Sequence, residues 1–225
     1  MNAPTLPDYY VVPTCLEEIG ILYADEHLLM INKPAFLLSV PGRAPENQDS
    51  VLGRLQRQYG DMKLVHRLDL DTSGIMAFAR TKPAQSALSR AFQQRTVLKT
   101  YEAIVDGIVE EDQGQIDLPL IADWPRRPLQ KVCYESGKHA LTYWHVLHRD
   151  YQKGTTRLRL KPVTGRSHQL RIHCRELGHP ILGCDMYAPR AIEYGSPRLM
   201  LHAHSIAFNH PVTGLWQTFT SPVPF

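Results

Sequence analysis

The stretch VHRLDLDTSGIMAFA (residues 65–79) places a dense polar segment directly before a run of apolar residues. The run at 75–79 has the length of a strand and no polar side chain, which is typical of a strand buried on both faces. Arg67 and Asp69 are candidate functional residues, because a loop that feeds a rigid strand is a good mount for a reactive side chain. The alternative is that both only satisfy a turn, which Gly74 closes in a backbone conformation that other residues avoid.

Helix and strand signals extend in both directions from this stretch. Before it, two apolar runs around residues 25–27 predict a hairpin, residues 41–49 an exposed loop, and residues 50–60 a capped helix. After it, a proline opens a second helix at 83–94. Apolar or alternating runs then predict strands at 101–107, 139–147, 156–163, 199–208 and 215–220, and a third helix is expected at 167–177.

The expected strands outnumber the expected helices and do not alternate with them. This pattern predicts an α+β fold with a mixed, largely antiparallel sheet flanked by helices and loops. The chain shows no internal repeat and no linker. Residues 1–19 are therefore expected to be an N-terminal extension and residues 20–225 a single domain.

The composition is that of an ordinary globular protein, with 43% hydrophobic and 21% charged residues. No segment reaches the roughly 18 apolar residues of a membrane span, and no signal peptide opens the chain, so the cytoplasm is the expected compartment. The four cysteines are scattered without a C-x-x-C pair, and reduced, mostly buried thiols are expected.

The formal net charge of +3 hides a strong asymmetry along the chain. Residues 124–175, the basic segment, hold twelve Lys and Arg against two acids, which is +10 and leaves −7 for the rest. This imbalance favours a nucleic-acid partner, because each phosphate contact releases counterions. The alternative is a solvated, strand-rich face that happens to be basic.

A second polar cluster lies at 161–173, where an expected strand ends at a Thr-Gly turn and a helix follows. Its donors are Arg166, His168, Gln169 and Arg171. A helix N-terminus and guanidinium groups favour an anion, either a phosphate or an active-site carboxylate. The alternative is an amphipathic helix with a solvated basic edge.

Histidines and cysteines recur between residues 168 and 204, so a zinc site has to be considered. The segment has neither H-E-x-x-H nor C-x-x-C, and His168 and His173 do not share a helix face, so no metal is expected. The chain also lacks the G-x-S-x-G, phosphate-loop and G-x-G-x-x-G motifs. The function classes that remain are an enzyme that needs no cofactor and a protein that only binds its partner.

Five segments in order resemble one family. HRLDLDTSG is similar to the signature of the RluA-type pseudouridine synthases, in which H-R-L-D-x-x-T-S-G carries the catalytic aspartate. Residues 117–138 resemble particularly the small member that modifies a tRNA anticodon stem-loop and a 23S rRNA hairpin and has no S4-like domain. The four further matching segments are NKPAFLLSVPG (32–42), LKTYEAIVDG (98–107), LKPVTGRSHQLRIHCRELGHPILG (160–183) and RLMLHAHSIAF (198–208).

The resemblance implies a pseudouridine synthase fold and roles for matched residues. Asp69 is similar to the catalytic aspartate, Tyr101 to the aromatic that packs on the target base, and Arg171 to the arginine that ion-pairs with the aspartate. Arg67 matches a residue that holds the flipped-out nucleotide. Further RNA contacts are expected from Lys99, Arg126, Arg127, Arg166, His168 and Gln169.

Two residues depart from the family pattern. Phe36 replaces the glycine usual after N-K-P-x, which leaves the path of that loop open. Cys184 stands where an aspartate usually follows H-P-I-x-G, and Asp185 comes one position later.

The implied reaction breaks the N1–C1′ bond of uridine, rotates the uracil and rejoins it through C5. It has no redox step and no activated donor, so no cofactor is expected. The carboxylate would attack the ribose or the base, or remove a ribose proton.

The expected partner is structured RNA. Neither a membrane nor an obligate protein partner is expected, and the protein is expected to be a monomer. The rival hypotheses are a family member with another target site, a non-catalytic RNA-binding module and a metal-dependent hydrolase.

Overall fold

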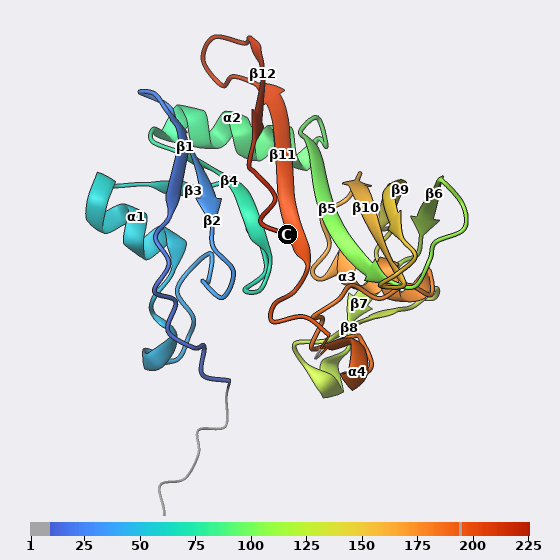
Figure 1. Cartoon of the computed structure of the whole chain (residues 1–225). Coiled ribbons are helices and arrows are strands. Elements are labelled where there is room, and N and C mark those ends of the chain that lie inside the picture. Colours follow the sequence, from blue (N-terminus) through green and yellow to red (C-terminus); the bar gives the residue numbers. More distant parts are fainter. Residues whose placement is uncertain (1–9, 194) are drawn as a thin grey trace, which may run out of the picture.

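The computed structural model describes residues 10–193 and 195–225, so residues 1–9 of the expected N-terminal extension lie outside the described part. One curved sheet dominates it (Figure 1), in the order β1-β2-β4-β11-β5-β10-β9-β6, with β12 paired to β11 and β3 to β4. Its strands are β1 Gly20–Ala24, β2 Leu28–Lys33, β3 Lys63–Leu64, β4 Ser73–Ala79, β5 Leu98–Asp106, β6 Gln113–Asp117, β9 Leu141–Asp150, β10 Thr155–Pro162, β11 Leu201–Asn209 and β12 Trp216–Thr220.

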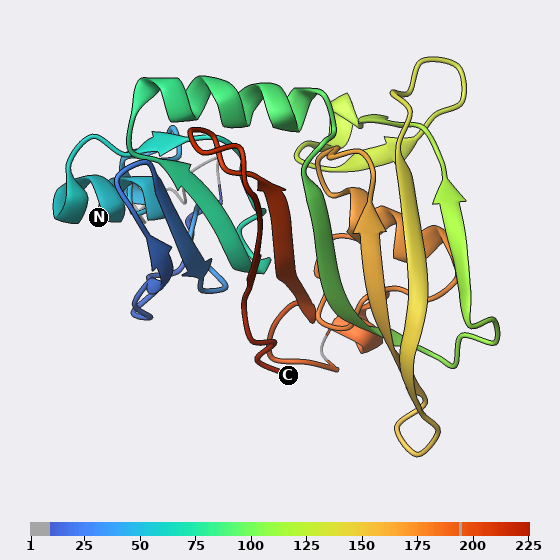
Figure 2. The same cartoon turned by 90° about the horizontal axis from the view of Figure 1, so that it is seen from above.

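A few helices and a small hairpin surround this sheet. Figure 2 shows the sheet fanning from β1 and β2, in blue, to β6, in yellow-green, with α3 on one face of β9 and β10. The smaller elements are α1 Val51–Tyr59, α2 Lys82–Gln93, α3 Gln169–Glu176, α4 Arg190–Glu193, the 3₁₀ turns η1 Pro45–Asn47 and η2 Trp124–Arg126, and the paired strands β7 Leu120–Ala122 and β8 Gln130–Val132. No described helix is both long and apolar enough to cross a membrane.

The strand pairings confirm the predicted α+β class. Among the described strands, β4 and β11 pair in parallel, and every other pair of neighbours is antiparallel. Each residue of β4 is buried, as the apolar run at 75–79 predicts. Three of the four cysteines are buried, which confirms the expectation of mostly buried side chains.

Local capping explains where the helices begin and end. The Ser50 hydroxyl accepts a hydrogen bond from the Gly53 amide at 3.2 Å, and Gly60 ends α1 with a φ of 78°. The third helix starts at Gln169, two residues later than predicted, because His168 has a left-handed backbone with a φ of 54°. The sequence pattern therefore placed α1, α2 and α3 within two residues of their observed bounds and did not predict the short α4.

Two hydrophobic clusters flank the middle of the sheet. One lies under β1, β2 and β4 with α1 and α2, and the other lies between β5, β9, β10 and α3. Tyr101, on β5, packs against both clusters. The seam between them is where a polar pocket opens.

Candidate active site

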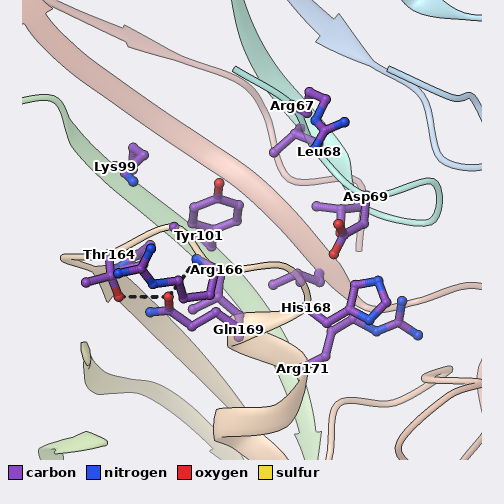
Figure 3. Close-up of a pocket in the computed structure, with 15 residues that line it drawn as sticks. Arg67, Leu68, Asp69, Lys99, Tyr101, Thr164, Arg166, His168, Gln169 and Arg171 are labelled. Carbon is purple, nitrogen blue, oxygen red and sulfur yellow. Dashed lines mark hydrogen bonds between the residues drawn. The ribbon is translucent and has the colours of Figure 1, made fainter. Parts of the chain in front are cut away.

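A pocket of about 110 Å³ opens at the seam between the two clusters (Figure 3). Its walls are the loop before β4, strand β5, and the turn that joins β10 to α3. Among its lining residues, Asp69 is the only carboxylate. The other polar lining residues are Arg67, Thr72, Lys99, Tyr101, Thr164, Arg166, His168, Gln169 and Arg171. The two polar clusters of the sequence thus form one site.

The backbone on both sides of Asp69 is fixed by the segment at 32–42. The ammonium of Lys33 is fully buried and donates to the Leu70 carbonyl at 2.9 Å and to two carbonyls of its own loop. The Ser39 hydroxyl donates to the Leu68 carbonyl at 2.6 Å and accepts from the Leu68 amide at 3.1 Å. Burial lowers the pKa of Lys33 to about 7. Sequence reasoning missed both anchors, and the matching NKPAFLLSVPG segment was the signal that pointed to them.

Phe36, the first departure from the family pattern, lies in the same segment, and the structure shows the path of its loop. Its φ is 60°, the left-handed conformation that glycine adopts at the least cost. The loop therefore keeps a path suited to glycine although a phenylalanine occupies the position.

His66 ties the loop to the buried strand that follows it. Its Nε2 accepts a hydrogen bond from the Ala77 amide at 2.9 Å, and its ring stacks on Phe92 with centroids 4.7 Å apart. Accepting through Nε2 requires a ring whose proton sits on Nδ1. Burial lowers the pKa of His66 to about 3, so this neutral form persists well below neutral pH.

The partly buried His66 makes the free energy of unfolding depend on pH. Unfolded His66 binds a proton near pH 6.5 and the folded ring does not, so stability is lost as the pH falls below 6.5. At pH 5 this linkage costs about 2 kcal/mol. We expect His66→Gln, whose carbonyl can still accept from Ala77, to lose about 2 kcal/mol less between pH 7 and pH 5. Urea unfolding at both pH values measures this, and equal losses in the two proteins would contradict the assignment.

Tyr101 presents its ring to the pocket. Its hydroxyl has no hydrogen-bond partner among the described residues, and burial raises its pKa, with a further contribution from the charge of Asp69. The phenol therefore stays protonated at neutral pH, and its ring is the surface that a ligand meets. In Figure 3 the ring comes from β5 and the carboxylate of Asp69 from the loop before β4.

Gln169 shapes the turn between β10 and α3. Its carbonyl oxygen accepts from the Thr164 hydroxyl at 2.8 Å (Figure 3) and from the Arg166 amide at 3.0 Å. Its amide nitrogen donates to the Leu141 carbonyl at 3.1 Å and to the Thr142 hydroxyl at 2.9 Å. The buried side chain is fully occupied by the protein, so its geometry favours holding the turn over contacting RNA.

His168 lies in the same turn, at the entrance to α3. Its Nδ1 lies 2.5 Å from the hydroxyl of Tyr187. Burial lowers its pKa, while the nearby Asp69 partly opposes this effect. A neutral ring at the pocket wall is the result.

Arg171 differs from the expectation in its partners. Its Nη1 lies 3.5 Å from Asp71, its Nη2 pairs with Asp185, and its Nε donates to the Cys184 thiol at 3.3 Å. No ion pair joins Arg171 and Asp69 within 4 Å in the described structure. Asp185, one position after the site where the family usually has an aspartate, forms the ion pair with Arg171 that was expected from Asp69. Arg171 is 1% exposed, so the solvated-edge interpretation of this helix is wrong.

Most cations of the basic segment also have carboxylate partners. Arg126 pairs with the buried Asp123 at 2.6 Å, while the guanidinium of Arg127 lies 3.1 Å above the ring of Trp124. Both arginines are exposed, as expected. The remaining pairs are Lys131 with Asp123, Arg149 with Asp112, Lys153 with Asp150, Arg157 and Arg159 with Glu102, and Arg175 with Glu176. The sequence excess of +10 therefore overstates the free positive charge of this segment.

The histidines that recur after residue 168 are dispersed among different partners. His173 bonds to Thr142, His179 to the Asp106 carbonyl, and His202 to a serine on each side. In the described residues no three His, Cys, Asp or Glu side chains are grouped so that they could hold a metal ion.

Known proteins resemble this chain over nearly its whole length. The family model for RNA pseudouridylate synthase matches residues 27–176. The dual-specificity RNA pseudouridine synthase RluA of Pasteurella multocida is 51% identical over 207 residues, which cover 92% of this chain and 94% of that protein. The Escherichia coli K12 protein of the same name is 50% identical over 206 residues, covering 91% and 93%. The solved structure of human RNA Pseudouridylate Synthase Domain Containing 1 has a TM-score of 0.79 at 29% identity, covering 95% of this chain and 86% of that one.

Proposed function

Since this chain belongs to the RNA pseudouridylate synthase family, isomerases that act on RNA, we propose that Asp69 is its catalytic carboxylate. The observation that carries the assignment is that Asp69 alone among the pocket-lining residues brings a carboxylate. Asp71, two residues along the same loop, is paired with Arg171 instead. The loop anchors at Leu68 and Leu70 hold Asp69 in place before RNA arrives.

The pocket supplies what the isomerisation needs. The glycosidic bond breaks, the uracil turns, and C5 forms the new bond to C1′ while C5 loses a proton and N1 gains one. We propose that Asp69 acts as nucleophile or base in this sequence. The target nucleotide has to leave its stack to reach the carboxylate, and the Tyr101 ring offers a flat surface worth about 1–3 kcal/mol for a stacked base.

The surrounding cations would hold the RNA backbone. Arg67, Lys99 and Arg166 line the pocket and have no carboxylate within 4 Å among the described residues. We assign Arg171 a positioning role, because its guanidinium is held by Asp71 and Asp185 and brings a buried positive charge to the wall behind Asp69. Arg126 and Arg127 would form an outer RNA contact on the exposed η2 turn.

The relatives named as dual-specificity enzymes suggest two RNA substrates for this chain. We propose a tRNA anticodon stem-loop and a 23S rRNA hairpin, modified by a cytoplasmic monomer whose residues 20–225 form one catalytic domain. The purified chain should form pseudouridine in both stem-loops when each is supplied alone, as mapped by carbodiimide labelling and primer extension. Modification of only one of them would overturn dual specificity, and modification of neither would favour a different target site.

Tyr101→Phe is expected to retain most of the activity, while Tyr101→Ala loses at least about tenfold. Phenylalanine keeps the stacking surface and removes a hydroxyl that has no partner and does not ionise at neutral pH. Initial rates of pseudouridine formation under single-turnover conditions measure the difference. If Phe is as inactive as Ala, the hydroxyl takes part in the chemistry and the stacking role is wrong.

A further inference from the structure

The active-site pocket continues into a groove of about 460 Å³. One wall is formed by residues 65–67 and by residues 92–97 at the end of α2, and the other by residues 163–167. Asp69, Lys99 and Tyr101 line both the pocket and this hollow, which we call the flanking groove. An RNA strand whose target base stacks on Tyr101 therefore has a continuous channel for its neighbouring nucleotides.

The charges of the flanking groove are one-sided. Arg67, Arg95, Lys99 and Arg166 line it, and Asp69 is the only acid among its lining residues. None of these four cations has a carboxylate within 4 Å in the described part of the chain, unlike most cations of the basic segment. A groove that gathers unpaired cations matches a polyanionic strand.

Arg95 is the member of this set that sequence reasoning did not single out. It follows α2 with a φ of 60°, and its amide donates to the Phe92 carbonyl at 3.2 Å. This is the left-handed position after a helix, where glycine is the favoured residue and another side chain costs roughly 1 kcal/mol. An exposed arginine at such a position suggests that its side chain serves binding rather than the stability of the fold.

We propose that the flanking groove binds the single RNA strand next to the target nucleotide and that Arg95 contacts one of its backbone phosphates. Arg67, Lys99 and Arg166 neutralise further phosphates along the same path. This inference rests on the proposed function for the identity of the ligand, and it adds a binding residue and a path for the strand. Contacts to phosphates are independent of base sequence, so the groove holds the strand without choosing the uridine.

Arg95→Gly separates the phosphate contact from the fold. Glycine removes the charge and also relieves the left-handed strain, so the melting temperature should stay level or rise. Binding to an anticodon stem-loop should weaken several-fold, and the slope of log K against log salt should become shallower by about 0.7. The rate at saturating RNA should change little. Arg90→Ala is the matched control, because Arg90 is an exposed arginine of α2 that does not line the groove.

A single neutral linkage in the RNA identifies the phosphate. A series of stem-loops is prepared, each with a single methylphosphonate at a different linkage beside the target nucleotide. The affinity of each RNA is measured for the unsubstituted protein and for Arg95→Gly. One linkage should weaken binding to the unsubstituted chain and have no further effect on the variant. Additive effects at every linkage, or an unchanged salt slope, would overturn the assignment of Arg95. Binding needs no turnover, so a chain that shows the coupling but forms no pseudouridine would refute the proposed function and leave the groove as an RNA site.

Discussion

Asp69→Asn is expected to lower the rate of pseudouridine formation by about a thousandfold or more while the RNA still binds. Asparagine matches the size of aspartate but can act neither as a nucleophile nor as a base at neutral pH. The neighbouring loop anchors are made by the backbone of Leu68 and Leu70, so they survive the substitution. Single-turnover rates and binding by fluorescence anisotropy separate the lost chemistry from the retained affinity.

Asp61→Asn is the matched control for this loss. Asp61 is an exposed aspartate of the preceding loop whose partner is Lys63 at 2.6 Å, and it does not line the pocket. Its substitution should leave the rate of pseudouridine formation unchanged. Substantial turnover by Asp69→Asn, or a comparable loss in the control, would contradict the assignment of the carboxylate.

Gly74→Ala is expected to destabilise the fold by about 3 kcal/mol or more. The φ of Gly74 is 115°, and a Cβ at this position would lie 2.3 Å from the carbonyl oxygen of Ala203. That contact is backbone against backbone at the parallel pairing of β4 with β11, so no side-chain rotation can relieve it. Urea unfolding at pH 7 measures the change, which should lower the melting temperature as well.

Gly154→Ala separates the steric clash from the cost of the dihedral angle. Gly154 has a φ of 62° and open space around its would-be Cβ, so alanine there should cost only about 1 kcal/mol. Equal losses in the two variants would mean that β4 and β11 can separate locally. In that case the strand pairing does not fix the position of the Asp69 loop as closely as the structure indicates.

Elements defined by nearby residues could be predicted from the sequence. The first hairpin, the helix between Ser50 and Gly60, and the buried run at 75–79 follow from caps, turns and the spacing of apolar residues. The meeting of the two polar clusters at 65–74 and 161–173 depends on strand order. That the clusters meet was implied only by the family resemblance, because periodicity does not determine which strands become neighbours.

The partners of buried charges could not be predicted from the sequence. Lys33 is expected at a surface from its residue type, yet it is fully buried because three carbonyls satisfy its ammonium. Arg171 was expected at Asp69, but the folded chain offers it Asp71 and Asp185 instead. The contacts of Lys33 with Leu70 and of Arg171 with Asp71 join residues far apart in the chain, so charge counting along the sequence cannot reveal them.

Tritium release from an anticodon stem-loop labelled with [5-³H]uridine tests the central claim most directly. Rejoining the base through C5 expels the hydrogen at that carbon, so each isomerisation releases one tritium to water. The unsubstituted chain should release one tritium per RNA molecule, and none from a stem-loop whose target uridine is replaced by cytidine. Stoichiometric binding of the uridine stem-loop and of the 23S rRNA hairpin without release from either RNA would contradict isomerisation in the Asp69 pocket.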